Sequence, residues 1–104
     1  MRIVFCSCPV QEAKTLARSV LKAHLAACVQ LLPPMESLYW WKGEICEDQE
    51  TLILFKTEAA VVADLKAFLL EHHSYTVPEI LSVDVNEEES HSDYVAWVRE
   101  QVRC

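Results

Sequence analysis

Two cysteines near the N-terminus, Cys6 and Cys8, have the type and spacing to bind a soft metal ion. In an extended strand, residues two apart point to the same face, so the two thiols would lie side by side. Such a pair suits Cu(I), which prefers few thiolate ligands. The alternative, that Cys8 is only a small residue before Pro9, stays open. No second Cys/His pair follows at zinc-finger spacing, which argues against a zinc knuckle.

Further metal-ligating side chains come later in the chain, in the adjacent pair His72-His73 and in Glu79, which follows a proline. Each has an ordinary structural interpretation as well. His72 would close the apolar stripe of a helix near its C-terminus, and Glu79 would begin a solvated strand. Cys6 would likewise be a small buried residue. Nothing in the local sequence gathers these residues at one place.

Catalytic activity is not expected. Cys6 and His72 could in principle form a nucleophile–base pair, but no third orienting group can be named for them. The chain has a single glycine, Gly43, so it lacks a glycine-rich oxyanion loop. The same scarcity argues against the phosphate-binding loops of Rossmann and P-loop proteins.

The composition indicates an acidic domain of the reducing cytoplasm. The 104 residues, 52% of them hydrophobic and 24% charged, suit a single domain over residues 1–104. Nine Lys and Arg against sixteen Asp and Glu give a net charge of −7, which argues against nucleic acid or anionic lipid as a partner. The five cysteines are odd in number and lack the spacing of a disulfide framework. No apolar run has the length of a secretory signal or of a membrane span.

The hydrophobic periodicity predicts four strand regions and three helices. Residues 58–72 place Val61, Leu65, Phe68 and His72 on one helical stripe. Gly43 separates two extended runs and is suited to a hairpin turn, while Pro33-Pro34 interrupts the first of those runs. The expected strands cover residues 3–6, 28–41, 44–57 and 79–86, and the expected helices cover residues 10–27, 58–72 and a final segment that starts at a capping box formed by Ser90 and Asp93.

This order, β-α-β-β-α-β followed by a helix, predicts a ferredoxin-like α+β fold with an antiparallel sheet and a long central hairpin. The two central strands exceed the usual length of 5–6 residues and would overhang a small sheet. We therefore expect self-association. The aromatic group Tyr39-Trp40-Trp41 beside the turn fits a subunit interface better than a surface that stacks on a ligand.

Four segments also resemble the CutA divalent-cation tolerance family. They are LAACV at residues 25–29, SLYWWKG at 37–43, ETLILFKT at 50–57 and HHSYTVPEI at 72–80. The resemblance covers nearly the whole chain and implies a ferredoxin-like subunit in a tight homotrimer. The plan is also similar to that of the PII signalling trimers, which implies, as an alternative function, a small ligand bound in the clefts between subunits.

The same resemblance implies a metal role, with copper as the ion and zinc as another candidate. The ligand positions that it implies are Cys6, His72 and Glu79, and His73 could take the place of His72. Thiolate, imidazole and carboxylate together suit copper or zinc better than Mg²⁺ or Ca²⁺. Ser74 stands where the family usually has proline, so we expect a looser metal site than in relatives that keep it.

Overall fold

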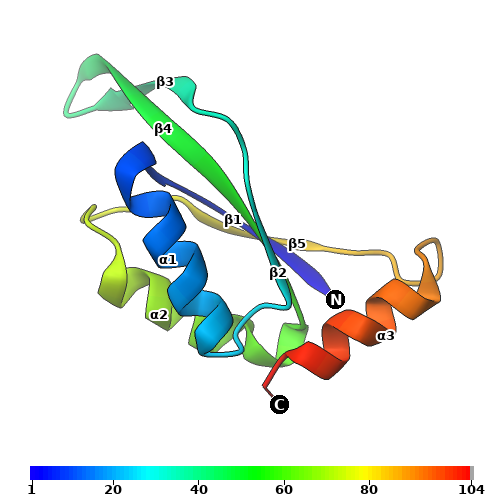
Figure 1. Ribbon diagram of the computed structural model, residues 1–104. Coiled ribbons are helices and arrows are strands. Elements are labelled where there is room, and N and C mark those ends of the chain that lie inside the picture. The colour runs from blue at the N-terminus through cyan, green and yellow to red at the C-terminus, as the bar shows by residue number, and fades with distance from the viewer. Residues whose placement is uncertain (104) are drawn as a thin grey trace.

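The computed structural model describes residues 1–103 and has the expected order of elements (Figure 1). Pro33-Pro34 splits the expected second strand in two, because proline cannot donate to a strand ladder. The elements are β1 (Arg2–Pro9), α1 (Val10–Lys22), β2 (Cys28–Leu31), β3 (Met35–Trp41), β4 (Glu44–Thr57), a 3-10 turn (Ala59–Val61), α2 (Val62–His72), β5 (Ile80–Asp84) and α3 (Ser92–Gln101).

The strands form one antiparallel sheet in the order β2-β4-β1-β5, and β3 pairs with the outer part of β4. α1 and α2 lie side by side over one face of this sheet (Figure 1). The predicted ferredoxin-like α+β fold is confirmed, with α3 added after the last strand. None of the helices within residues 1–103 is long and apolar enough to cross a lipid bilayer.

The core fills the layer between the sheet and the two helices. Alternate residues of β1 and β4 point into it, as the period of a strand requires. The largest buried side chains come from both strands and from the helices that cover them, and they include Val4, Val20, Ile53, Phe55, Leu65 and Leu69. Each contributes about 1.5–3 kcal/mol through the apolar surface that it removes from water.

The first helix is shorter than expected. It ends at Lys22 rather than near residue 27, because His24 adopts a left-handed backbone conformation with φ 56° that a helix cannot contain. The His24 ring Nδ1–H donates to the backbone oxygen of Gln101 over 3.0 Å, which ties this turn to the end of α3. The chain then places Leu25 and Ala26 in the core.

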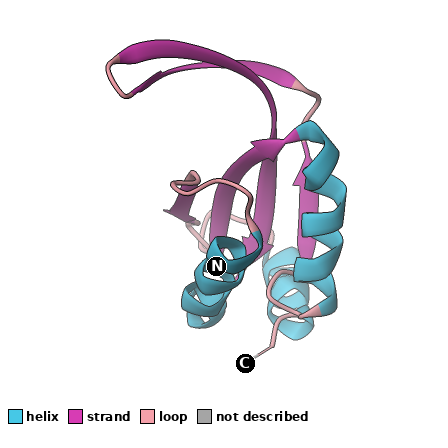
Figure 2. Ribbon diagram, turned by 90° about the vertical axis from the view of Figure 1, so that its left-hand side faces the viewer, coloured by secondary structure: helices cyan, strands magenta, loops and turns pink. Residues whose placement is uncertain are grey.

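The central hairpin turns at Lys42-Gly43, as predicted from the lone glycine. The two residues have φ values of 51° and 80°, which match the two-residue turn that the twist of paired strands favours. Beyond the residues of β4 that pair with β1, the β3–β4 ribbon extends on its own. Figure 2 shows this ribbon arching away from the rest of the sheet. The predicted overhang is therefore present.

The sheet face opposite α1 and α2 is only partly covered. The alternation of Leu81 and Val83 with Ser82 and Asp84 predicts a strand that buries its apolar side, yet in the single chain Leu81 and Val83 are 58% and 47% exposed. Phe5 and Leu54 lie beside Leu81 across the sheet on this same face. We call Phe5, Leu54, Leu81 and Val83 the open face.

The last helix packs at the end of the sheet through Val95 and Val98. The predicted capping box does not form: α3 begins at Ser92, and the Ser90 hydroxyl instead donates to the backbone oxygen of Asn86 over 2.6 Å. That bond closes the preceding turn and leaves the Ser90 side chain unavailable to the helix.

Candidate functional site

Cys6 and Cys8 both lie on the buried side of β1, so the prediction that they share a face is confirmed. The Cys6 side chain has no exposed surface. Its pKa is raised to about 12, first by burial and then by electrostatic interactions with Cys8, Glu79 and Glu50. Burial is also the main reason that the pKa of Cys8 is raised to about 11. Both thiols are protonated at neutral pH, and a metal ion would have to displace those protons.

The two adjacent histidines occupy different environments. His72 is exposed at the end of α2, where its ring stacks on Phe68 with centroids 4.1 Å apart. Its Nδ1–H donates to the Phe68 backbone oxygen over 2.9 Å, so Nε2 is the nitrogen that could bind a metal ion. His72 therefore lies at the edge of the predicted stripe rather than in the core.

His73 is the buried member of the pair, at 9% exposure. Its Nδ1 accepts the backbone N–H of Tyr75 at 3.0 Å, so Nε2 carries the proton and donates to the Ser7 backbone oxygen at 2.7 Å. Both ring nitrogens are used. His73 thus anchors the segment that follows α2 to β1, and in this structure it cannot replace His72 as a metal ligand.

Glu79 is exposed just before β5, and its negative charge contributes to the raised pKa of Cys6. The register pairs Cys6 with Ile80, which places Glu79 next along the chain, close to β1. The third expected ligand, His72, lies at the end of α2. Within residues 1–103 no group of three or more His, Cys, Asp or Glu side chains is arranged to hold a metal ion. One chain alone does not assemble the implied copper site.

The Ser74 side chain forms a hydrogen bond with another element of the fold. Its hydroxyl donates to Glu12 of α1 over 3.0 Å. A hydrogen bond to the neighbouring helix thus restrains this segment. How tightly the segment holds a metal ion stays a prediction.

A cleft of about 740 Å³ opens where the hairpin overhang meets residues 74–79. Its size falls within the range of small-molecule sites. Ser7 of β1 contributes to its wall. Most of its larger lining side chains are aromatic or acidic, namely Tyr39, Trp40, Trp41, Tyr75, Glu50 and Glu79.

Two phenol–carboxylate hydrogen bonds order this cleft. Tyr75 donates to Glu50 over 2.9 Å, and Tyr39 donates to Asp48. The bond to Asp48 is the main reason that the pKa of Tyr39 is raised to about 12. The pKa of Tyr75 is raised well above its usual value, first by burial and then by Glu50. The described lining of the cleft includes two acidic residues, Glu50 and Glu79, and no basic one.

The sequence reasoning found the aromatic group of this cleft but not its acidic partner. It assigned Tyr39, Trp40 and Trp41 to a subunit interface, and in the single chain they line the cleft. Glu50 and Tyr75 were missed as a pair because they are 25 positions apart and meet only when β4 lies against the segment after α2. Glu50 follows the polar stretch Glu47-Asp48-Gln49 of β4, so no local pattern singled it out.

Comparison with known proteins gives consistent matches. The family model described as CutA1 divalent ion tolerance protein matches residues 2–101. The divalent-cation tolerance protein CutA of Thermus thermophilus is 39% identical over 99 residues, which cover 94% of each protein. The protein CutA of Homo sapiens is 41% identical over 97 residues, which cover 92% of this chain and 53% of the human protein. The chain thus spans about half the length of that human relative.

Solved structures agree in fold. The PII-like protein CutA from Nostoc sp. PCC 7120, in its apo form, superposes with a TM-score of 0.95 at 30% identity, covering 99% of this chain and 98% of that one. The solved structure of the divalent cation tolerance protein from Thermus thermophilus gives a TM-score of 0.93 at 37% identity, covering 99% of this chain and 100% of that one.

Proposed function

Because this chain belongs to the CutA1 divalent ion tolerance protein family, we propose that it is a homotrimer that binds divalent cations, with copper as its ion. The observation that carries the proposal is the open face, on which Leu81 and Val83 are exposed in a single chain. Apolar surface of this kind, beside a hairpin that extends beyond its own sheet, favours packing against further copies.

The proposed copper ligands are Cys6, His72 and Glu79. Thiolate is a soft donor and imidazole a borderline donor, and both suit copper. Zinc is the alternative ion. Since one chain does not gather the three, the proposed site is completed where subunits meet. Cys6 and His72 bind a metal only when deprotonated, so affinity should fall as the pH decreases.

The test is anaerobic metal analysis of protein purified without an affinity tag, together with light scattering on the same sample. The expected result is a mass of three chains with bound copper. A monomer mass at micromolar concentration would contradict the assembly. A trimer that remains metal-free after incubation with copper would contradict the metal role and leave the assembly intact.

The cleft supports a second candidate function, the binding of a small signalling ligand. Its volume of about 740 Å³ suits a small molecule, and the Nostoc relative is described as PII-like. Gentle native mass spectrometry would reveal such a ligand as additional mass on the purified protein. Protein that shows only the mass of its chains, both as purified and after incubation with a cell extract, would count against it.

We also propose that the chain is not an enzyme and works in the cytosol. The family is named for cation tolerance rather than for a reaction. The raised pKa of Cys6 is the opposite of what a nucleophilic cysteine needs. Free thiols at Cys6, Cys8, Cys28 and Cys46 suit a reducing compartment. A hydrolase or transferase activity that Cys6→Ser abolishes in a folded protein would overturn the first statement.

A further inference from the structure

Glu50 is a buried carboxylate that faces the cleft. Only 7% of the residue is exposed, and one of its oxygens accepts the Tyr75 hydroxyl at 2.9 Å. No ion pair within residues 1–103 involves Glu50. Buried charges in proteins are usually paired with an opposite charge. Within the described part of the single chain, this carboxylate therefore has no cationic partner.

The walls around Glu50 would also favour a cation. Tyr39, Trp40, Trp41 and Tyr75 line the cleft, and the face of an aromatic ring attracts positive charge. The second carboxylate of the lining, Glu79, is exposed. None of the described residues that line the cleft is Lys, Arg or His.

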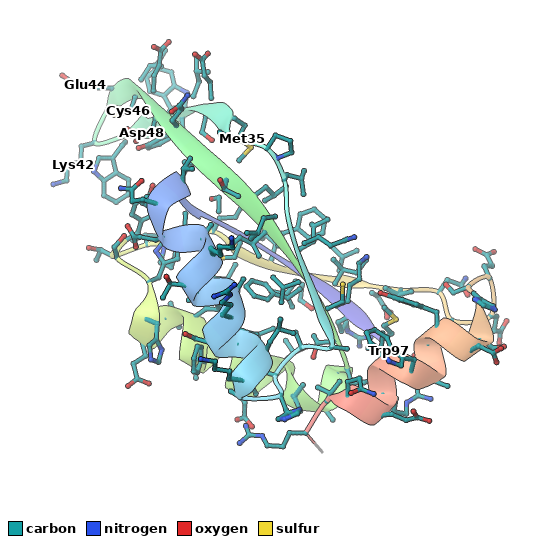
Figure 3. The ribbon with its side chains drawn as sticks, in the orientation of Figure 1. Met35, Lys42, Glu44, Cys46, Asp48 and Trp97 are labelled. Carbon is teal, nitrogen blue, oxygen red and sulfur yellow. The ribbon has the colours of Figure 1, made fainter. Side chains whose placement is uncertain are left out.

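The hairpin provides no internal cation for this place. Lys42 lies in the turn and does not line the cleft. Figure 3 shows Lys42, Glu44, Cys46 and Asp48 together on the overhanging hairpin, with Trp97 on α3, away from the hairpin.

We propose that this cleft binds a small organic cation: a protonated amine on an apolar body, with its charge beside Glu50 and its body against the aromatic side chains. This inference rests on the second candidate function and specifies the class of ligand. An anion is disfavoured because it would meet two carboxylates and no lining cation. A purely apolar ligand would leave the Glu50 charge buried and unpaired. A bare metal ion would not use the aromatic walls.

The first experiment compares three probes of one shape by isothermal titration calorimetry at pH 7, with EDTA present to remove metal ions. The probes are benzylamine, which is protonated at this pH, benzyl alcohol, which is neutral, and benzoate, which is anionic. We expect saturable binding of benzylamine and at least tenfold weaker binding of the other two. Equal binding of all three, preferred binding of benzoate, or no binding of benzylamine would overturn the proposal.

The second experiment removes the charge while preserving the shape. Glu50→Gln should weaken benzylamine binding about tenfold, while benzyl alcohol should bind as before. The matched control is Glu88→Gln, which makes the same change in net charge at an exposed position outside the cleft and should alter affinity less than twofold. Should Glu50→Gln fail to fold, Glu79→Gln at the exposed rim should still weaken benzylamine selectively. An equal loss of benzylamine affinity in Glu88→Gln would mean that the net charge of the protein, and not the Glu50 side chain, controls binding, which would overturn the proposal.

The same samples separate this inference from the functions on which it rests. Light scattering reports the oligomeric state independently of the probes. A trimer that binds no benzylamine would overturn the proposal while the assembly stands. A natural ligand found by native mass spectrometry to be neutral or anionic would overturn the organic cation and keep the cleft as a binding site.

Discussion

Leu81→Asp should separate the assembly of this protein from the folding of its chain. Leu81 lies on the open face and is 58% exposed in the single chain. The folded monomer therefore gains little from its apolar surface, and an aspartate there should reduce chain stability by no more than about 1 kcal/mol, the range of strand propensities. In a trimer that covers the open face, the same substitution places a carboxylate in the interface.

The effect on assembly follows from the exposed fraction. Complete burial of a leucine side chain is worth about 1.5–3 kcal/mol, so burying the exposed 58% of Leu81 contributes about 0.9–1.7 kcal/mol per subunit. Three subunits lose at least about 2.6 kcal/mol, and each buried carboxylate costs several more. A loss of about 2.6 kcal/mol already lowers the association constant roughly 80-fold.

The assay is light scattering after size-exclusion chromatography, with circular dichroism to confirm that the variant is folded. We expect wild-type trimer and folded Leu81→Asp monomer. Leu70→Asp is the matched control, because Leu70 is 51% exposed but lies on α2, away from the open face. A Leu81→Asp variant with the mass of the wild type would refute the reasoning, as would equal dissociation of the control.

Three further predictions use other parts of the structure. Burial and the Glu50 hydrogen bond raise the pKa of Tyr75. The stability that they provide is complete below the phenol's ordinary pKa of 10 and is lost as the pH rises above it. In Glu50→Gln, absorbance at 295 nm should show that Tyr75 ionises at a lower pH than in the wild type. Gly43→Ala meets no atom within 4 Å but must keep φ 80°, so urea denaturation should show a loss of about 1 kcal/mol. Iodoacetamide should label the half-buried Cys28 and Cys46 well before the two buried cysteines of β1, as peptide mass spectrometry can show.

The order of elements could be predicted from sequence because each signal was local. Gly43 is the only glycine, so it indicated the hairpin turn, and Pro33-Pro34 indicated an interruption, which the structure shows to be a complete break between β2 and β3. The end of the first helix was missed because a left-handed histidine is unusual. His24 adopts that conformation in a turn bonded to α3, a contact that no local pattern contains.

The candidate site was less predictable because its contacts join residues that are far apart in the sequence. Periodicity placed His72 on an apolar stripe, whereas the α2 C-terminus turns so that His73 enters the protein and bonds with β1. The contact between Glu50 and Tyr75 joins distant segments, so neither residue stood out alone. The burial of Leu81 was expected from strand alternation, and its exposure in the single chain is what points to assembly.

The most direct test of the proposed copper function is a competition between the protein and a chelator for Cu(I) and for Cu(II), measured anaerobically on the assembled protein. The double variant Cys6→Ser/His72→Ala should lose most of its affinity for both ions. The control Cys46→Ser/His91→Ala replaces the same residue types at positions outside the proposed site and should bind as the wild type does. Unchanged copper affinity in Cys6→Ser/His72→Ala, with a folded and trimeric protein, would contradict the account.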